Sequence, residues 1–195
     1  MTWSGAPYRL SAALRRLGVS VTGFQPQLGR ARRLAYAARH IRRGYGRLSL
    51  SEQILRSAPA WHHQAREIAA FIAQHGLRSV LHTGTLDLPS FDLLRNVRHY
   101  LYCDHTWSLA LPHRPDAQDL SNVARDEYDR LERQSYQGLE HIFTFGSYVR
   151  DELIRVYGVA PERVTVVGSG MGEIELLQPA YWSSSPCPSG SVSHQ

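Results

Sequence analysis

A polar cluster that follows the expected strand 98–103 holds the side chains best suited to chemistry, Asp104, His105 and Trp107. A neutral imidazole at His105 could position or polarise a hydroxyl group of a ligand, and the Asp104 carboxylate could orient that imidazole or act as a base. A histidine beside a tryptophan in a loop can equally be a packed, hydrogen-bonded residue. The residues alone leave both interpretations open.

Other patterns point less clearly to chemistry. Ser147 lies in Phe-Gly-Ser-Tyr-Val, which lacks the G-x-S-x-G turn of serine hydrolases, so we expect it to cap a helix. The Gly-x-Gly-x-Gly pattern at 168–172 follows an expected strand but opens no recognisable helix, which makes it a poor dinucleotide fingerprint. Adjacent His62 and His63 diverge by about 100° on a helix, and His99, His105 and His113 show no zinc spacing. We expect no metal ion and no cofactor.

The elements that position these residues are clearest in the segment 139–172. A short β-branched and aromatic run, 141–145, predicts a strand, and the apolar residues after it move to helical spacing. Gly158 follows the last periodic residue and Pro161 forbids continuation, so the helix ends there. A buried type of parallel strand follows at 164–167. The order strand, helix, strand places the chain in the α/β class, in which ligands bind at the carboxyl ends of the strands.

The rest of the chain supplies further elements of the same kind. Apolar spacing predicts helices at 7–17, 60–74 and 118–139, and strands at 19–21, 79–82 and 98–103. The third helix carries an apolar stripe that we expect to lie in the core, formed by Leu120, Ala124, Tyr128, Leu131 and Leu139. Its place before the strand at 141–145 is typical of a crossover helix.

The segment 139–172 resembles the end of the amino-terminal domain of GT-B type glycosyltransferases, in particular family 4. That family has a helix after a serine turn and then a YGV-P-ERV-VV stretch, which this chain matches at Tyr157, Gly158, Val159, Pro161, Glu162, Arg163, Val164, Val166, Val167 and Gly170. The beginning of the chain follows the family's order of a helix with L--ALRRLG and then V-V. Ser169 and Gly172 depart from the family, which carries an Asn before the Gly and an Asp shortly after it.

The resemblance implies a Rossmann-like, doubly wound, mostly parallel sheet, in an acceptor-side domain that spans residues 5–172. The implied activity is transfer of a sugar from a nucleotide-sugar donor to an acceptor hydroxyl, on a glycan or lipid, without a required metal. His105 and Asp104 are the implied catalytic residues. The expected substrate-binding residues are Gly5, His82, Thr83, Gly84, Trp107, Ser147, Ser169 and Gly170.

Two features lead us to expect that the chain is a fragment. The family has a hydrophobic strand and a glycine-rich turn before the first helix, whereas only Met1 to Ser4 precede Gly5 here, and without that strand we expect two half-sheets with unpaired edges. After Met171 we recognise no pattern of the second, donor-binding domain, and we expect residues 173–195 to form a disordered or aberrant Ser/Pro-rich tail. We therefore expect little or no activity from this chain alone.

The net charge of +5 is modest, but seven arginines fall between Arg30 and Arg47, on an expected helix with one apolar face. The favoured interpretation is a packed surface helix, and docking on an anionic membrane surface is the second. Nucleic-acid binding is disfavoured because no recognition motif accompanies the charge. Neither a signal peptide nor an 18-residue apolar run is visible, and the two cysteines have no metal spacing, so we expect a cytoplasmic protein. Peripheral binding at the inner face of the membrane is the alternative that the arginine-rich region leaves open.

Two other functions stay open at this level. The chain could be a non-catalytic module of a split glycosyltransferase, which binds acceptor or docks on a membrane and recruits a donor-binding partner. It could also be another α/β enzyme, such as a hydrolase that uses Ser147, although the residues around Ser147 disfavour this.

Overall fold

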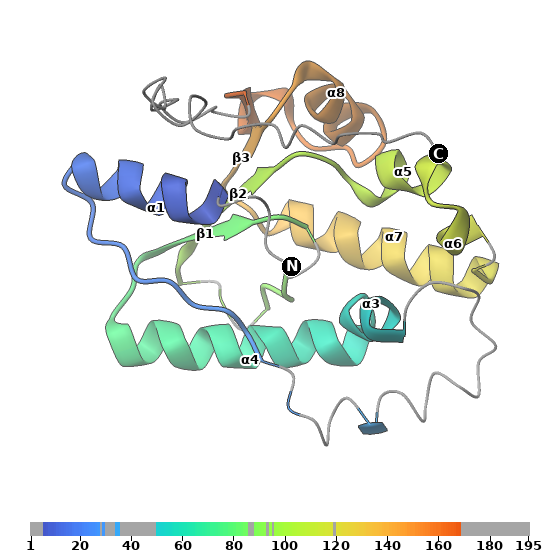
Figure 1. Ribbon diagram of the computed structural model, residues 1–195, viewed down its shortest axis with the longest axis horizontal. Coiled ribbons are helices and arrows are strands. Elements are labelled where there is room, and N and C mark those ends of the chain that lie inside the picture. Colours follow the sequence, from blue (N-terminus) through green and yellow to red (C-terminus); the bar gives the residue numbers. More distant parts are fainter. Residues whose placement is uncertain are drawn as a thin grey trace, which may run out of the picture.

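The described part of the chain folds around one parallel β-sheet (Figure 1). The computed structural model describes residues 6–27, 29, 34–35, 50–85, 88–92, 94, 96–118 and 120–168. Within them the strands pair in sequence order, and their bounds are β1 (Ser79–Thr83), β2 (Arg98–Cys103), β3 (His141–Thr144) and β4 (Val164–Val166). All three pairings are parallel. The prediction of an α/β fold with a parallel sheet is confirmed.

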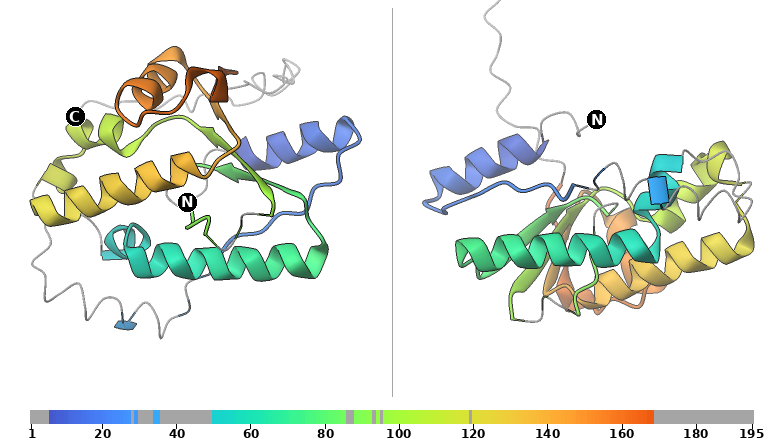
Figure 2. Two further views of the ribbon diagram at one scale, coloured as in Figure 1. Left: turned by 180° about the vertical axis from the view of Figure 1, so that it is seen from behind. Right: turned by 90° about the horizontal axis from the view of Figure 1, so that it is seen from below.

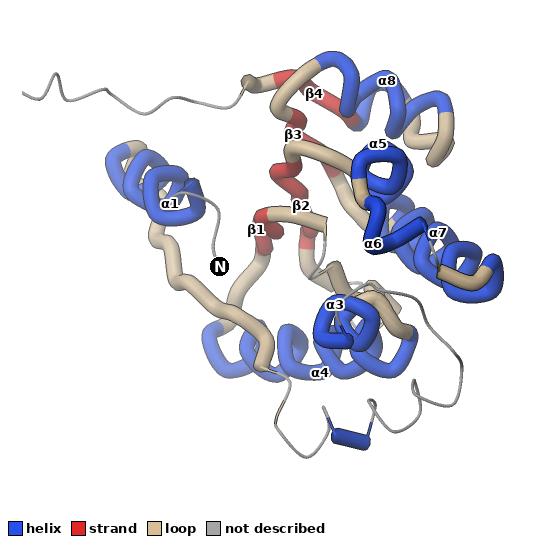
Figure 3. The backbone as a smooth tube through the Cα atoms, turned by 45° about the vertical axis from the view of Figure 1, so that its right-hand side comes forward, coloured by secondary structure: helices blue, strands red, loops and turns tan. Residues whose placement is uncertain are grey.

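Parallel strands need long crossovers, and the helices supply most of them. Their bounds are α1 (Ala6–Arg16), α3 (Leu50–Leu55), α4 (Ala58–His75), α5 (Trp107–Ala110), η1 (Leu111–His113), α6 (Pro115–Gln118), α7 (Asn122–Gln137), α8 (Ser147–Arg155) and η2 (Pro161–Arg163). Figure 2 shows α1 and α7 on opposite sides of the strands. In Figure 3, α5, α7 and α8 lie on one side of the sheet, and α4 runs below β1.

The main core lies between the sheet and the pair α7 and α8. Leu101 of β2 and Ile142 of β3 are fully buried neighbours in register, and Val149 and Leu153 of α8 are fully buried in the same cluster. The predicted apolar stripe is confirmed, because all five of its members are buried: Leu120, Ala124, Tyr128, Leu131 and Leu139. A smaller cluster joins α4 to β1, with Ile68 and Ile72 beside Val80.

Three local predictions are wrong. Residues 19–21 form no strand, and Val19 is 48% exposed, because no neighbouring strand among the described residues pairs with this segment. The predicted helix 118–139 begins only at Asn122, since the Ser121 side chain accepts a hydrogen bond from the Ala124 N–H and caps it there. Ser147 is the first residue of α8 and not its cap, a position that Gly146 takes without a side-chain bond.

The expectation of two half-sheets is also wrong for the described strands, which form one continuous sheet. Several other expectations fall on residues outside the described ranges and are not tested. They concern Gly5, Ser169, Gly170, the tail at 173–195 and, apart from Leu34 and Ala35, the arginine-rich region from Arg30 to Arg47. Among the helices of the described ranges, none is both long enough and apolar enough to cross a bilayer.

Two histidines are buried inside the fold, one on β1 and one on β2. His82 Nε2 and His99 Nδ1 are 3.1 Å apart, and the ring of Phe91 packs against both imidazoles. Burial and the neighbouring His99 lower the pKa of His82 to about 3. Burial lowers the pKa of His99 to about 4. Both imidazoles are therefore neutral in the fold at neutral pH.

This pair should make the fold sensitive to acid. Below pH 6.5 the unfolded chain protonates both histidines and the folded chain does not, so the free energy of unfolding should fall by about 1 kcal/mol per pH unit for each histidine. Urea unfolding at pH 6.5, 5.75 and 5 measures the slope. The control variant His62→Gln, at an exposed position of α4, should show the same dependence of the free energy of unfolding on pH as the wild-type chain. A free energy of unfolding that stays constant over this range would contradict the assignment.

Candidate functional site

The carboxyl ends of the four described strands lie at one edge of the sheet, where backbone hydrogen bonds hold the following loops together (Figure 1). The Gly84 N–H donates to the Tyr102 carbonyl at 3.0 Å, and the Phe145 N–H donates to the Cys103 carbonyl at 3.1 Å. Gly84 has φ +95°, which suits glycine and turns the chain away directly after β1. The ladder thus continues past the strand ends and brings the loops after β1, β2 and β3 side by side.

Asp104 and His105 form a hydrogen-bonded pair at this edge, directly after β2. The contact joins Asp104 Oδ1 to His105 Nδ1. An ionised carboxylate only accepts, so Nδ1 carries the proton, and in the neutral ring Nε2 carries a lone pair. The Asp104 side chain is 34% exposed and the His105 side chain is 42% exposed, so a ligand can reach the imidazole. The structure therefore gives Asp104 the geometry to orient His105.

The hydrogen bond to Asp104 raises the pKa of His105, while burial and the positive charge of Arg56 oppose the rise. A histidine whose pKa is raised by folding stabilises the fold fully below its unfolded pKa, and this contribution is lost as the pH rises through its folded pKa. The pair with Asp104 thus favours the protonated form of the imidazole.

Asp104→Asn should lower the pKa of His105, because the strongest stabiliser of the imidazolium is removed. An NMR titration of the imidazole signals measures the change. Asp151→Asn is the matched control, since Asp151 is an exposed carboxylate on α8 that pairs with Arg150. An unchanged pKa of His105 in Asp104→Asn would contradict the hydrogen-bonded pair.

Tyr148 covers the backbone of the pair from α8. Its hydroxyl donates to the Asp104 carbonyl at 3.0 Å, and the residue is 57% exposed. The ring lies against Gly146, where an added Cβ would stand 2.7 Å from a ring carbon. Gly146 therefore permits the close approach that lets Tyr148 reach the loop after β2.

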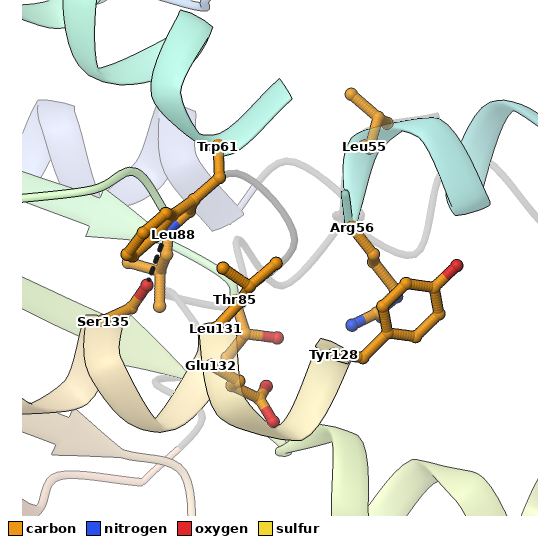
Figure 4. Close-up of a pocket in the computed structure, with 9 residues that line it drawn as sticks. All are labelled: Leu55, Arg56, Trp61, Thr85, Leu88, Tyr128, Leu131, Glu132 and Ser135. Carbon is orange, nitrogen blue, oxygen red and sulfur yellow. Dashed lines mark hydrogen bonds between the residues drawn. The ribbon is translucent and has the colours of Figure 1, made fainter. Parts of the chain in front are cut away.

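A small pocket of about 30 Å³ lies among residues of α3, α4, α7 and the segment after β1 (Figure 4). Its lining combines apolar side chains with a few polar groups: Leu55, Arg56, Trp61, Thr85, Leu88, Tyr128, Leu131, Glu132 and Ser135. Trp61 Nε1–H donates to Ser135 Oγ at 2.9 Å across one wall. This volume suits one or two water molecules and not a sugar ring.

The structure brings only some of the predicted residues to this edge. Thr83 is the last residue of β1, Gly84 follows it and bonds to the carboxyl end of β2, and Ser147 is exposed at the start of α8. His82 points to the buried side of β1 and contacts His99. Trp107 is 2% exposed, with its ring between Arg56 and Tyr128. Gly5, Ser169 and Gly170 lie outside the described residues.

Sequence reasoning missed three residues around the pair, Arg56, Glu132 and Tyr148. Glu132 lies four positions after Tyr128, on the apolar face of α7, and a carboxylate on such a face is a visible signal of a buried polar contact. Arg56 and Tyr148 carried no comparable signal, because an arginine between two helices and a tyrosine near a helix start are usually surface residues.

Comparison with known proteins agrees with the Rossmann-like α/β architecture described above. A model of the family described as Glycosyltransferase Family 4 matches residues 7–171, which includes all four strands and the Asp104–His105 pair. No curated protein and no solved structure matches the chain. The match covers well over half of the sequence. This chain belongs to glycosyltransferase family 4.

Proposed function

We propose that this chain is the acceptor-side domain of an enzyme that transfers a sugar from a nucleotide-sugar donor to an acceptor hydroxyl. Membership of the family supports transfer of a sugar. The observation that carries the proposal further is the Asp104–His105 pair, an oriented and exposed imidazole at the carboxyl edge of a parallel sheet, where ligands of this fold class bind.

In this proposal the acceptor hydroxyl donates a hydrogen bond to His105 Nε2. That contact positions the hydroxyl oxygen and increases its electron density while the oxygen attacks the anomeric carbon of the donor sugar. As the acceptor oxygen bonds to the anomeric carbon, the bond from that carbon to the nucleotide diphosphate breaks and the hydroxyl proton passes to His105 Nε2. The nucleoside diphosphate leaves with the bonding electron pair. Asp104 keeps the Nδ1 tautomer and stabilises positive charge on the ring.

The nucleotide-sugar in this proposal is bound by a second domain, which faces the carboxyl edge of the sheet. A cleft between the two domains would exclude water from the reacting groups. The acceptor, a glycan or a lipid glycan, would then lie over Asp104 and His105 and beside the exposed ring of Tyr148.

The test is transfer of radiolabelled sugar by the native protein, isolated from its source with an antibody against residues 139–168. The probes are UDP-glucose, UDP-galactose and GDP-mannose, each supplied with a glycolipid and glycan extract of the same source. We expect label from one donor to enter the extract. Absence of label from all three, under conditions in which a known glycosyltransferase added to the same extract is active, would contradict the proposal.

A further inference from the structure

Helix α5 begins two residues after His105, and every N–H of its first three residues has an acceptor. The Trp107 N–H lies 3.1 Å from Glu132 Oε1 and 2.9 Å from Oε2. The Ser108 N–H donates to the Tyr157 hydroxyl at 3.2 Å, and the Leu109 N–H donates to Thr106 Oγ1 at 3.3 Å. Two of these three acceptors come from other elements of the fold, so the loop that carries His105 is held from outside.

Glu132 and Tyr157 form one unit beneath this turn. The Tyr157 hydroxyl donates to Glu132 Oε2 at 2.6 Å, and both residues are buried. Burial raises the pKa of Glu132, and the hydrogen bond from Tyr157, the charge of Arg56 and the Trp107 N–H oppose that rise. All of the donors converge on the two carboxylate oxygens, which is the arrangement that an ionised carboxylate requires.

Arg56 contacts the same turn through the Trp107 ring. Its guanidinium lies 4.4 Å from the centre of the Trp107 ring, and its Nε donates to Glu52 Oε1 at 3.2 Å. Trp107 is thus fixed by its backbone on Glu132 and by its ring under Arg56. The same two charges act on His105, since Glu132 raises its pKa and Arg56 lowers it.

Burying a carboxylate between packed helices costs free energy, because the charge loses its hydration. A well-packed apolar side chain of similar size at such a position is often neutral or more stabilising. Glu132 nevertheless lies on the apolar face of α7, beside the buried Leu131 and Tyr128. The contacts of Glu132 fix the position of the Trp107 backbone at the start of α5. This positioning, and not added stability, accounts for a carboxylate at this place.

We infer that Glu132, together with Tyr157, is a positioning residue for His105, holding the start of α5 so that the imidazole faces the acceptor. The inference rests on the proposed function for the role of His105. Glu132 itself is buried behind the turn and acts through the Trp107 N–H.

The test compares Glu132→Gln with the matched variant Glu162→Gln, which removes an exposed carboxylate from η2. NMR on the full chain measures amide exchange at Trp107 and the titration of the His105 ring. In Glu132→Gln we expect the Trp107 amide to exchange on the order of tenfold faster, because a charged acceptor is lost. The pKa of His105 should fall, since the charge that raises it is gone while Asp104 and Arg56 remain. Glu162→Gln should change neither.

Two further variants keep the inference testable if Glu132→Gln folds poorly. Glu132→Leu fills the site without an acceptor and should release the Trp107 amide in the same way. Tyr157→Phe should release the Ser108 amide. Wild-type exchange and an unchanged His105 titration in Glu132→Gln or Glu132→Leu would overturn the inference. These readouts need no sugar transfer, so failure of the positioning role and failure of the proposed function are distinguishable.

Discussion

Replacement of His105 by asparagine should lower the rate of sugar transfer by about 10²- to 10⁴-fold, the usual contribution of a positioned acid or base group. The asparagine side chain can still approach Asp104 but presents no imidazole Nε2 to the acceptor hydroxyl. The rate is measured with the native protein from a source that carries the substitution, by incorporation of label from the donor that the wild-type protein uses.

The control for this variant is His113→Asn. His113 is an exposed residue of η1, outside the group of residues at the carboxyl edge. It should transfer sugar at the wild-type rate. Equal rates for His105→Asn and His113→Asn would show that His105 takes no part in sugar transfer. They would also contradict the placement of the active site at the Asp104–His105 pair.

Ile142→Ala should lower the free energy of unfolding by about 2–5 kcal/mol. Ile142 is fully buried in β3, paired in register with Leu101 on one side and Val164 on the other, so its side chain fills the centre of the main core. Truncation leaves a cavity that the sheet cannot close without moving β2 or β4. Urea unfolding at neutral pH measures the loss.

Val123→Ala provides the matched truncation at the surface. Val123 is 71% exposed near the start of α7. Its free energy of unfolding should stay within about 0.5 kcal/mol of the wild-type value. Similar losses in Ile142→Ala and Val123→Ala would show that the core does not lie between β3 and the helices α7 and α8.

The sequence predicts much of the sheet because its strands and crossover helices are locally consistent. Apolar spacing, Gly158 and Pro161 mark the ends of α8 and the start of the last strand, and these agree with the structure. The apolar stripe of α7 lies in the core as the spacing indicates. The strand at 19–21 failed because β propensity makes a strand only where a neighbour pairs with it, and none of the described strands does.

The site was harder to predict because it depends on which way each side chain points. Asp104 and His105 could be identified from their position after a strand. His82 also lies near a strand end, but side chains alternate along a strand, so it faces the buried side while Thr83 is exposed. Trp107 is the first residue of α5, and the contacts that bury it, to Arg56 and Tyr128, join segments far apart in the sequence.

The role of Glu132 was also hard to predict from the sequence. The helical spacing places it on the buried face of α7, but the reason for a carboxylate there is a backbone N–H some 25 residues earlier. The spacing can signal that Glu132 makes a buried polar contact, but the partner follows from the tertiary packing of α5 on α7, which the local sequence does not specify.

The measurement that tests the central claim most directly follows the two ring nitrogens of His105 by ¹⁵N NMR during addition of methyl α-glucoside, methyl α-mannoside and methyl β-galactoside. The account predicts that Nδ1 stays protonated beside Asp104 throughout the titration. At least one glycoside should shift the His105 Nε2 signal in the wild-type chain. The same glycoside should leave the remaining histidine signals of His105→Asn unchanged. A neutral ring protonated on Nε2, or an Nε2 signal that none of the glycosides moves, would contradict the claim that an Asp104-oriented His105 meets the acceptor hydroxyl.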